Sequence, residues 1–143
     1  MIYMGIDPGK DGAMALIMDN SVTIIPFDEQ GYQIALENIR GSEARCCLER
    51  VFGRQGWSAN STFAFGENFG FIRGLLQANG ISYELVTPQK WKKVFGATDK
   101  NKAVTVCERL FPSVSLLRTP MCKKAHDGMA EALLMAEYAR RKL

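Results

Sequence analysis

The chain lacks long hydrophobic runs, and it has a single histidine, His126, among its 143 residues. No apolar stretch approaches the roughly 18 residues that a membrane-spanning helix needs. The first residues do not combine a basic segment, an apolar segment and a cleavage site, so we expect no signal peptide. No convincing set of Ser, His and Asp, or of Cys and His, points to a nucleophilic side chain. We therefore expect a cytoplasmic protein whose chemistry relies on other groups.

The four cysteines lack the paired spacing of a zinc site. Cys46 and Cys47 are adjacent in a short apolar stretch, which favours reduced thiols in the core over a disulfide or a metal role. Hydrophobic residues make up 47% of the chain and charged residues 23%, the balance of a globular protein. No repeat, low-complexity tract or linker divides the sequence, so we predict a single domain over residues 1–143.

Basic residues are clustered, although the net charge is only +3. They gather at 90–102, at 123–124 and at 140–142. Such clusters are typical of a protein that binds a polyanion, but an ordinary solvated lysine surface would look the same. Charge alone therefore leaves both interpretations open.

Apolar runs and turn residues predict an α/β protein with a mixed sheet. The expected strands span residues 1–7, 12–19, 21–27, 44–51 and 81–86. The expected helices span residues 29–40, 62–77, 89–95, 99–110 and 124–141, and residues 52–61 form a loop. In the second helix Gly66, Gly70 and Gly74 recur every four residues. This spacing suits close packing on the protein's own sheet or on a twin helix in a dimer.

Two carboxylates are associated with expected strands. Asp7 ends the first apolar run and precedes a turn that contains a proline and two glycines. A carboxylate held there can bind a divalent cation or can simply initiate the turn. Glu49 lies within an apolar strand, where burying it alone would cost several kcal/mol. It is therefore exposed at an edge, paired with a neighbouring arginine, or placed for function.

Two further carboxylates lie in the last expected helix. Asp127 and Glu131 are four residues apart, so their side chains share one face of the helix. Like charges at this spacing repel unless a cation lies between them, which Lys123, Lys124 or a metal ion would supply. Four carboxylates suit a pair of Mg²⁺ ions that act on a phosphodiester. We interpret His126 as a surface or supporting group rather than a base.

Five blocks of the sequence together resemble the RuvC-type Holliday-junction resolvases of the RNase H-like superfamily. The blocks are Gly5–Gly12, Cys47–Val51, Ser61–Leu76, Val86–Lys92 with Asp99–Ala103, and Asp127–Ala136. They follow the family's order and span nearly the whole chain, and the short members from phages and viruses are the most similar. The resemblance implies an RNase H-like α/β fold, with a mixed five-stranded sheet flanked by helices.

The resemblance also implies an activity. It implies a homodimeric, metal-dependent endonuclease that nicks two strands of a four-way DNA junction symmetrically. The cofactor would be Mg²⁺ or Mn²⁺, two ions per site, and the products would carry 5′-phosphates and 3′-hydroxyls. By position, the catalytic metal ligands would be Asp7, Glu49, Asp127 and Glu131, with Asp7 bridging both ions. The phosphate contacts would be Lys92 and Lys102, with Lys93 and Lys100 near them.

The sequence departs from the family at its last acidic pair. The family commonly has two Asp three residues apart, whereas the residue three before Glu131 is Gly128, and Asp127 lies one residue earlier. Asp11, although near Asp7, fits a turn residue. The loop after Glu49 carries Arg54, Gln55 and Trp57. These residues would grip or stack on an opened DNA strand. Alternatively, the tryptophan simply covers the core.

Two other functions fit parts of the pattern. One is an RNase H-like protein that binds branched DNA without cutting it. The complete set of four acids argues against this function. The other is a phosphotransferase of the actin and sugar-kinase type, whose strand, Asp and glycine turn are similar. That class needs two such lobes and a much longer chain.

Overall fold

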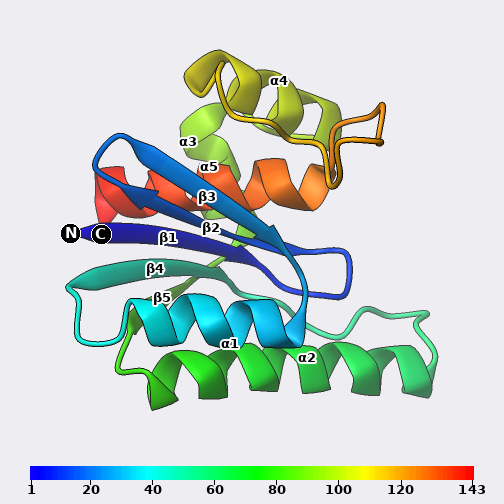
Figure 1. Ribbon diagram of the computed structural model, residues 1–143. Helices are drawn as coiled ribbons and strands as arrows, with labels where there is room; N and C mark the ends of the chain where they lie inside the picture. Colours follow the sequence, from blue (N-terminus) through cyan, green and yellow to red (C-terminus); the bar gives the residue numbers. More distant parts are fainter.

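A computed structural model describes residues 1–143 and shows one mixed five-stranded sheet in the order β3-β2-β1-β4-β5 (Figure 1). The strands are β1 (Ile2–Asp7), β2 (Ala13–Met18), β3 (Ser21–Pro26), β4 (Ala44–Glu49) and β5 (Ser82–Val86). The first three strands form antiparallel hairpins, whereas β1 pairs with β4, and β4 with β5, in parallel. The predicted RNase H-like α/β fold is confirmed.

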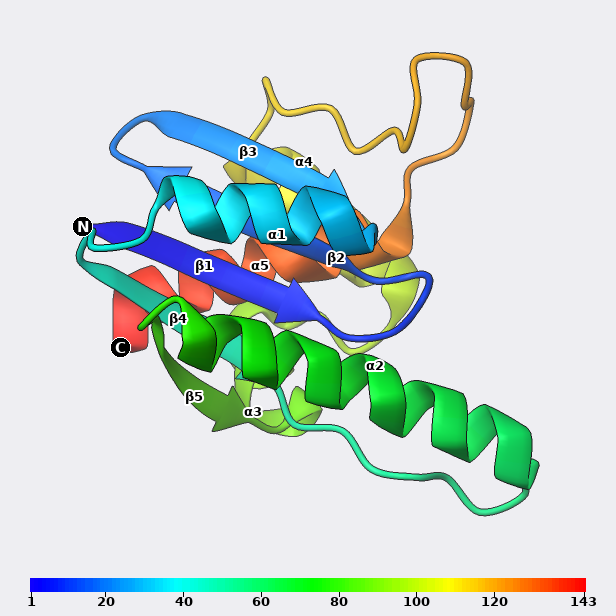
Figure 2. The same ribbon diagram turned by 60° about the horizontal axis from the view of Figure 1, so that its bottom comes forward.

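Helices cover both faces of this sheet. They are α1 (Glu29–Asn38), α2 (Ala59–Ala78), α3 (Pro88–Phe95), α4 (Lys100–Leu110) and α5 (Asp127–Lys142). Helices α1 and α2 lie against one face, and α5, with α3 and α4 beyond it, lies against the other (Figures 1 and 2). The sheet therefore separates two apolar clusters, one under α1 and α2 and one around α5.

The alternation of side chains along β1 decides which residues meet α5. Ile2, Met4 and Ile6 are buried in the cluster under α1 and α2. Because successive residues of a strand point to opposite faces, Gly5 and Asp7 face α5. Glu49 follows the same rule on β4, since Cys47 belongs to the α5 cluster.

Gly5 lets α5 lie unusually close to β1. A Cβ built on Gly5 would collide with the backbone of α5 at Ala132 and Ala136, and would lie 2.7 Å from the Met135 carbonyl carbon. The helix is buried on all sides from Gly128 to Ala139. This contact fixes the position of α5 over the strand that ends in Asp7.

Three of the element boundaries that differ from the sequence prediction lie close to the predicted site residues. Strand β4 ends at Glu49 rather than at residue 51, which places the carboxylate at the strand end. Helix α2 starts at Ala59, within the segment predicted as a loop, because the Ser58 side chain accepts a hydrogen bond from the Ser61 N–H. Helix α5 starts at Asp127 rather than at residue 124, because His126 caps it.

Cys46, Cys47 and Cys107 are buried free thiols, and Cys122 is partly buried. None of the helices combines the length and the apolarity that crossing a bilayer would require.

Replacing Gly5 by Ala tests the close approach of α5. We expect the variant to lose more than about 3 kcal/mol of unfolding free energy, because the added methyl meets rigid backbone rather than a movable side chain. Denaturant unfolding followed by circular dichroism measures the loss. An unfolding midpoint equal to that of the wild type would show that α5 does not lie this close to β1.

Candidate active site

Three of the four predicted acids meet at the carboxyl ends of the parallel strands β1 and β4. Ile6 is paired with Leu48, so Asp7 and Glu49 follow at adjacent strand ends. Glu131 of α5 lies one residue before Ala132, which packs on Gly5. Glu49 and Glu131 are buried, and Asp7 is partly buried. The fold thus brings the three carboxylates to one place.

The three carboxylates strain one another electrostatically. Burial raises the pKa of Asp7 well above its usual value, and the charges of Glu131 and Glu49 raise it further. Burial likewise raises the pKa of Glu131, to which the charge of Glu49 adds. Such a group of acids is stabilised by any cation that enters between them.

Glu49 is neither exposed nor paired with an adjacent arginine. The indole N–H of Trp91 on α3 donates a hydrogen bond of 2.7 Å to Glu49 Oε2, in the interior. Burial raises the pKa of Glu49, and this hydrogen bond opposes the rise. Sequence reasoning included Trp91 in the lysine-bearing segment but assigned it no role. The feature of the sequence that could have indicated a role for Trp91 is a large apolar residue within a run of lysines.

Asp127, the fourth predicted acid, lies at the margin. Its side chain is 43% exposed, and its carboxylate lies 3.9 Å from the Lys100 ammonium. The pairing cation is thus Lys100, rather than Lys123 or Lys124 as the sequence suggested. The charge of Asp127 still raises the pKa of Glu131, although it is the smallest of the contributions that shift this pKa.

The turn between β1 and β2 leaves no room for a side chain at position 128, where the resemblance predicted an acid. A Cβ at Gly128 would collide with the Asp11 carbonyl oxygen and lie 3.1 Å from Gly12 Cα. The first turn of α5 therefore packs directly on the backbone of the hairpin turn. No side chain fits at position 128, so the acid of this helix end stands one residue earlier.

His126 serves as a helix cap in this structure. Its Nδ1 accepts a hydrogen bond of 3.1 Å from the Met129 N–H. Asp127 in the first turn adds a negative charge where the helix dipole favours one. This agrees with the interpretation of His126 as a supporting group.

The predicted basic residues divide into two groups. Lys92 and Lys100 lie near enough to the carboxylates to lower the pKa of both Asp7 and Glu131, and Arg54 does so for Glu49. Lys93 is exposed, and no hydrogen bond or ion pair joins it to the acids. Lys102 donates from its ammonium to Thr98 Oγ1 at 3.0 Å. Only the first group borders the acids.

Helix α2 holds the turn that follows Asp7. Asn68 Oδ1 accepts a hydrogen bond of 2.8 Å from the Gly9 N–H, and Phe65 covers Gly9. Gly9 has φ of 112°, which glycine tolerates far better than other residues. Asn68 was not among the predicted site residues, although a polar residue within the apolar stripe of a helix is a signal for such a partner.

The loop after Glu49 extends this contact outward. The Trp57 and Phe65 rings meet edge to face with centroids 5.4 Å apart, and the Arg54 guanidinium lies 5.6 Å from the Trp57 centroid. Phe52 is largely exposed and carries the Arg50 guanidinium 5.2 Å from its centroid. Trp57 thus does not fill the core, and the loop presents aromatic and cationic groups beside the acids.

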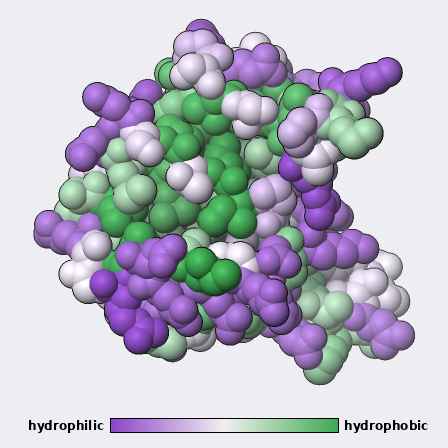
Figure 3. Space-filling view, in the orientation of Figure 1, coloured by the Kyte–Doolittle hydropathy of each residue, from purple (hydrophilic) through white to green (hydrophobic).

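The site opens between two projecting parts of the molecule. The loop before α5 and the loop between β4 and α2 both extend beyond the end of the sheet where β1 and β4 finish (Figure 1). The space-filling view in the same orientation is indented between these two projections, and mostly hydrophilic residues border the indentation (Figure 3).

A metal ion was expected here, and the donor set suits one only in part. No group of three His, Cys, Asp or Glu side chains is arranged so that it could hold an ion. The chemistry of the donors nevertheless fits a hard divalent cation, because Asp7, Glu49 and Glu131 offer only carboxylate oxygens and repel one another. The residues therefore have the ligand type and the charge that the expected cation needs, but their side chains are not arranged around a common metal position.

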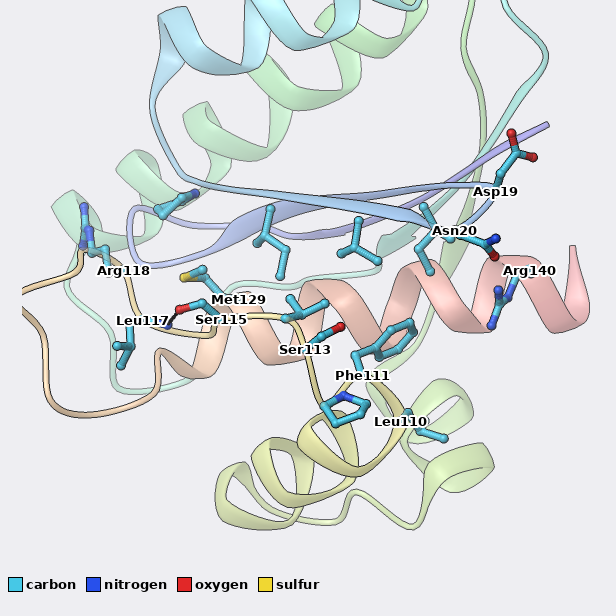
Figure 4. A pocket seen from close by; sticks show the side chains of 16 residues that line it. Asp19, Asn20, Leu110, Phe111, Ser113, Ser115, Leu117, Arg118, Met129 and Arg140 are labelled. Atoms are coloured by element: carbon cyan, nitrogen blue, oxygen red, sulfur yellow. Dashed lines mark hydrogen bonds between the residues drawn. The ribbon is translucent and has the colours of Figure 1, made fainter.

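A second hollow lies away from the acids and lacks their chemistry. It has a volume of about 640 Å³ between β3, the loop after α4 and α5. Its walls include Val22, Ile24, Phe111 and Met129, with Arg118 and Arg140 towards opposite ends (Figure 4). None of the four predicted acids lines it, so we do not assign it to catalysis.

Replacing Asp7 by Asn tests the electrostatic strain. In EDTA at neutral pH we expect the variant to melt a few degrees higher than the wild type, because a buried charge beside two others is removed. A raised folded-state pKa means that the wild type loses stability as pH rises through that pKa. The difference should therefore shrink as pH falls towards 4.

Asp11→Asn is the matched control, since Asp11 is an exposed acid of the same turn. We expect its melting temperature to stay within about one degree of the wild type, because surface substitutions cost little. Equal melting of Asp7→Asn and Asp11→Asn at neutral pH would contradict the strained site.

Comparison with known proteins agrees with this architecture. No family model and no curated protein matches the sequence. Among solved structures, RuvC of Thermus thermophilus in complex with a Holliday junction substrate superposes with a TM-score of 0.65 at 16% identity, over 99% of this chain and 96% of that one. A second Thermus thermophilus RuvC structure gives 0.62 at 18% identity, with the same coverage.

A eukaryotic protein shares the arrangement. The yeast mitochondrial Holliday junction resolvase Ydc2 superposes with a TM-score of 0.52 at 14% identity, over 96% of this chain and 77% of that one. The chain therefore has the RNase H-like fold of the RuvC-type Holliday-junction resolvases, along nearly its whole length.

Proposed function

We propose that this protein is a metal-dependent endonuclease that resolves branched DNA such as Holliday junctions. The observation that carries the proposal is the meeting of Asp7, Glu49 and Glu131 at one end of the sheet, bordered by Lys92 and Lys100. One of the structural neighbours is a RuvC in complex with a Holliday junction substrate, which supports DNA as the substrate class.

The acids would hold the cofactor. Asp7, Glu49 and Glu131 would bind Mg²⁺ or Mn²⁺, with Asp127 as a further ligand reached from the helix end. When bound, such ions stabilise the attacking water and the leaving oxygen of a phosphodiester, which gives 5′-phosphate and 3′-hydroxyl ends. The charges of both Glu49 and Glu131 act on Asp7, so Asp7 is the acid that would be shared if two ions bind.

The basic and aromatic groups would bind the DNA. Lys92 and Lys100, next to the acids, would contact the phosphate to be cleaved, and Lys93 and Lys102 would contact phosphates farther along the strand. Arg54 and Trp57 lie in the loop after Glu49, where the guanidinium and the indole ring, 5.6 Å apart, would offer a surface for an unpaired base. Together they would hold one opened strand across the carboxylates.

A homodimer would act on the two strands of a junction. Gly66, Gly70 and Gly74 are exposed along α2, and a Cβ on any of them would meet nothing within 4 Å. Packing on the protein's own sheet therefore does not explain the glycines. Phe63, which is 72% exposed, continues the same side of the helix. We propose that α2 packs against α2 of a second copy, which would place two active sites in one symmetric particle.

A panel of DNAs tests the nuclease. Four-way, three-way and linear DNAs are incubated with Mg²⁺ or Mn²⁺ and the wild type or Asp7→Asn. We expect the wild type to nick the four-way junction and Asp7→Asn to lose at least about 10³-fold in rate, since several kcal/mol of transition-state stabilisation are removed. Junction affinity in Ca²⁺ should change little, because the lysines remain.

The control is Asp11→Asn, which we expect to cut at the wild-type rate. A wild type that binds junctions tightly but nicks none of them with either ion would support the non-cutting DNA-binding protein instead. Asp7→Asn losing junction binding while remaining folded would count against both roles.

Substitution on the glycine stripe tests the dimer. Gly70→Arg adds a long charged side chain at the centre of the stripe, and it also improves helix propensity by several tenths of a kcal/mol. We expect a folded monomer by analytical ultracentrifugation. Thr105→Arg on the exposed side of α4, across the sheet, is the control and should remain dimeric. A Gly70→Arg variant that is still dimeric would exclude this helix as the interface.

A further inference from the structure

The proposed reaction assigns no role to Trp91, yet Trp91 contacts Glu49, one of the proposed metal ligands, directly. Its side chain is fully buried, and its indole N–H donates to Glu49 Oε2 at 2.7 Å. A buried tryptophan needs a partner for its N–H. A main-chain carbonyl would meet that need, but here the acceptor is a carboxylate of the candidate active site.

We propose that Trp91 is a positioning residue that holds the Glu49 carboxylate in the orientation required to bind the divalent cation. This inference rests on the proposed function. The last torsion of a glutamate is broad, so the carboxylate rotates freely unless a partner fixes it. A donor on Oε2 fixes the rotation and leaves Oε1 open for another ligand. Partners of this kind govern the affinity of metal sites in general.

The start of α3 fixes Trp91 beside Glu49. Val86, the last residue of β5, is the register partner of Glu49 on β4. The chain then turns at once into α3, with Thr87 as the cap and Pro88 at the first helical position. The Trp91 N–H of the main chain donates to the Thr87 carbonyl at 3.3 Å. One helical turn thus joins the indole rigidly to the strand pair that carries the carboxylate.

The same ring also contacts a neighbouring cation. The Lys92 ammonium lies 5.5 Å from the centroid of the Trp91 ring, within the range of a cation–π contact. Lys92 is the cation that acts most strongly on Glu131, and it acts on Asp7 and Glu49 as well. Trp91 therefore orders a ligand with its N–H and a proposed phosphate-binding lysine with its face.

Trp91→Phe separates these contributions, because it removes the N–H and keeps an aromatic face. We expect Mn²⁺ affinity, measured by calorimetry on DNA-free protein, to fall about tenfold or more. With junction DNA, kcat should fall while KM stays within twofold, since the phosphate contacts remain. Phe95→Leu, which shortens another buried side chain of α3, is the control for lost packing and should keep the wild-type Mn²⁺ affinity.

A double-mutant cycle shows whether Trp91 acts through Glu49. In a Glu49→Gln background, adding Trp91→Phe should cause little further loss of Mn²⁺ affinity, because coupled residues are not additive. The indole ¹⁵N–¹H resonance gives a direct readout. Adding Mg²⁺ should shift the Trp91 signal in the wild type but not in Glu49→Gln, with Trp57, the other tryptophan, as the reference.

The outcomes distinguish this proposal from the function on which it rests. A Trp91→Phe variant that equals Phe95→Leu in Mn²⁺ affinity and kcat would overturn the role of Trp91. Additive losses of Mn²⁺ affinity in the double-mutant cycle would overturn it as well. A wild type that binds Mn²⁺ but cuts no DNA would overturn the nuclease and leave the positioning role standing. A wild type that binds no Mn²⁺ would overturn both.

Discussion

The contact between β1 and α5 at Gly5 determines how the acids are placed in this fold. A strand and a helix can approach so closely only where no side chain separates their backbones. This approach buries α5 on all sides and places Glu131 over the strand end that carries Asp7. A second close contact, of Gly128 on the β1–β2 turn, fixes where the helix begins. The position of the acids thus follows from two glycines that carry no chemistry.

This close packing has an electrostatic cost that the neighbouring residues reduce. Asp7, Glu49 and Glu131 raise the free energy of the fold when all three are charged. Trp91 donates to Glu49, and Lys92 and Lys100 supply positive charge from α3 and α4. These partners lower the cost without removing it. The remaining shortage of positive charge supports the proposal that the three acids bind a divalent cation. Lys92 and Lys100 are also the lysines that we propose to contact the DNA phosphates.

The fold could be predicted from the sequence because its periodicities are simple. Apolar runs and turn residues indicated the strands and helices, and the order of five blocks indicated their arrangement. Boundaries at caps were less predictable. Helix α5 starts at residue 127 because the His126 ring accepts the Met129 N–H, a role that propensity does not assign to histidine. Helix α2 starts early for a similar local reason, at Ser58.

Only the site residues that stand out from their local sequence could be predicted. Asp7 and Glu49 stand out because they end or interrupt apolar runs. The pairing of Asp127 with Lys100 and the bond from Trp91 to Glu49 join segments 27 and 42 residues apart, so no local pattern reveals them. The exclusion of a side chain at position 128 depends on the hairpin turn against which it packs, and it is visible only in three dimensions.

The proposed function requires Asp7, Glu49 and Glu131 to bind a divalent cation together. Anomalous diffraction from a crystal of the protein soaked in Mn²⁺ would locate the ion. We expect a Mn²⁺ peak within about 2.5 Å of carboxylate oxygens from all three residues, in the range of metal–oxygen bonds. A crystal whose Mn²⁺ peaks lie only at exposed acids such as Asp11 or Asp19, with Asp7, Glu49 and Glu131 free of metal, would show that these three acids do not form a metal site.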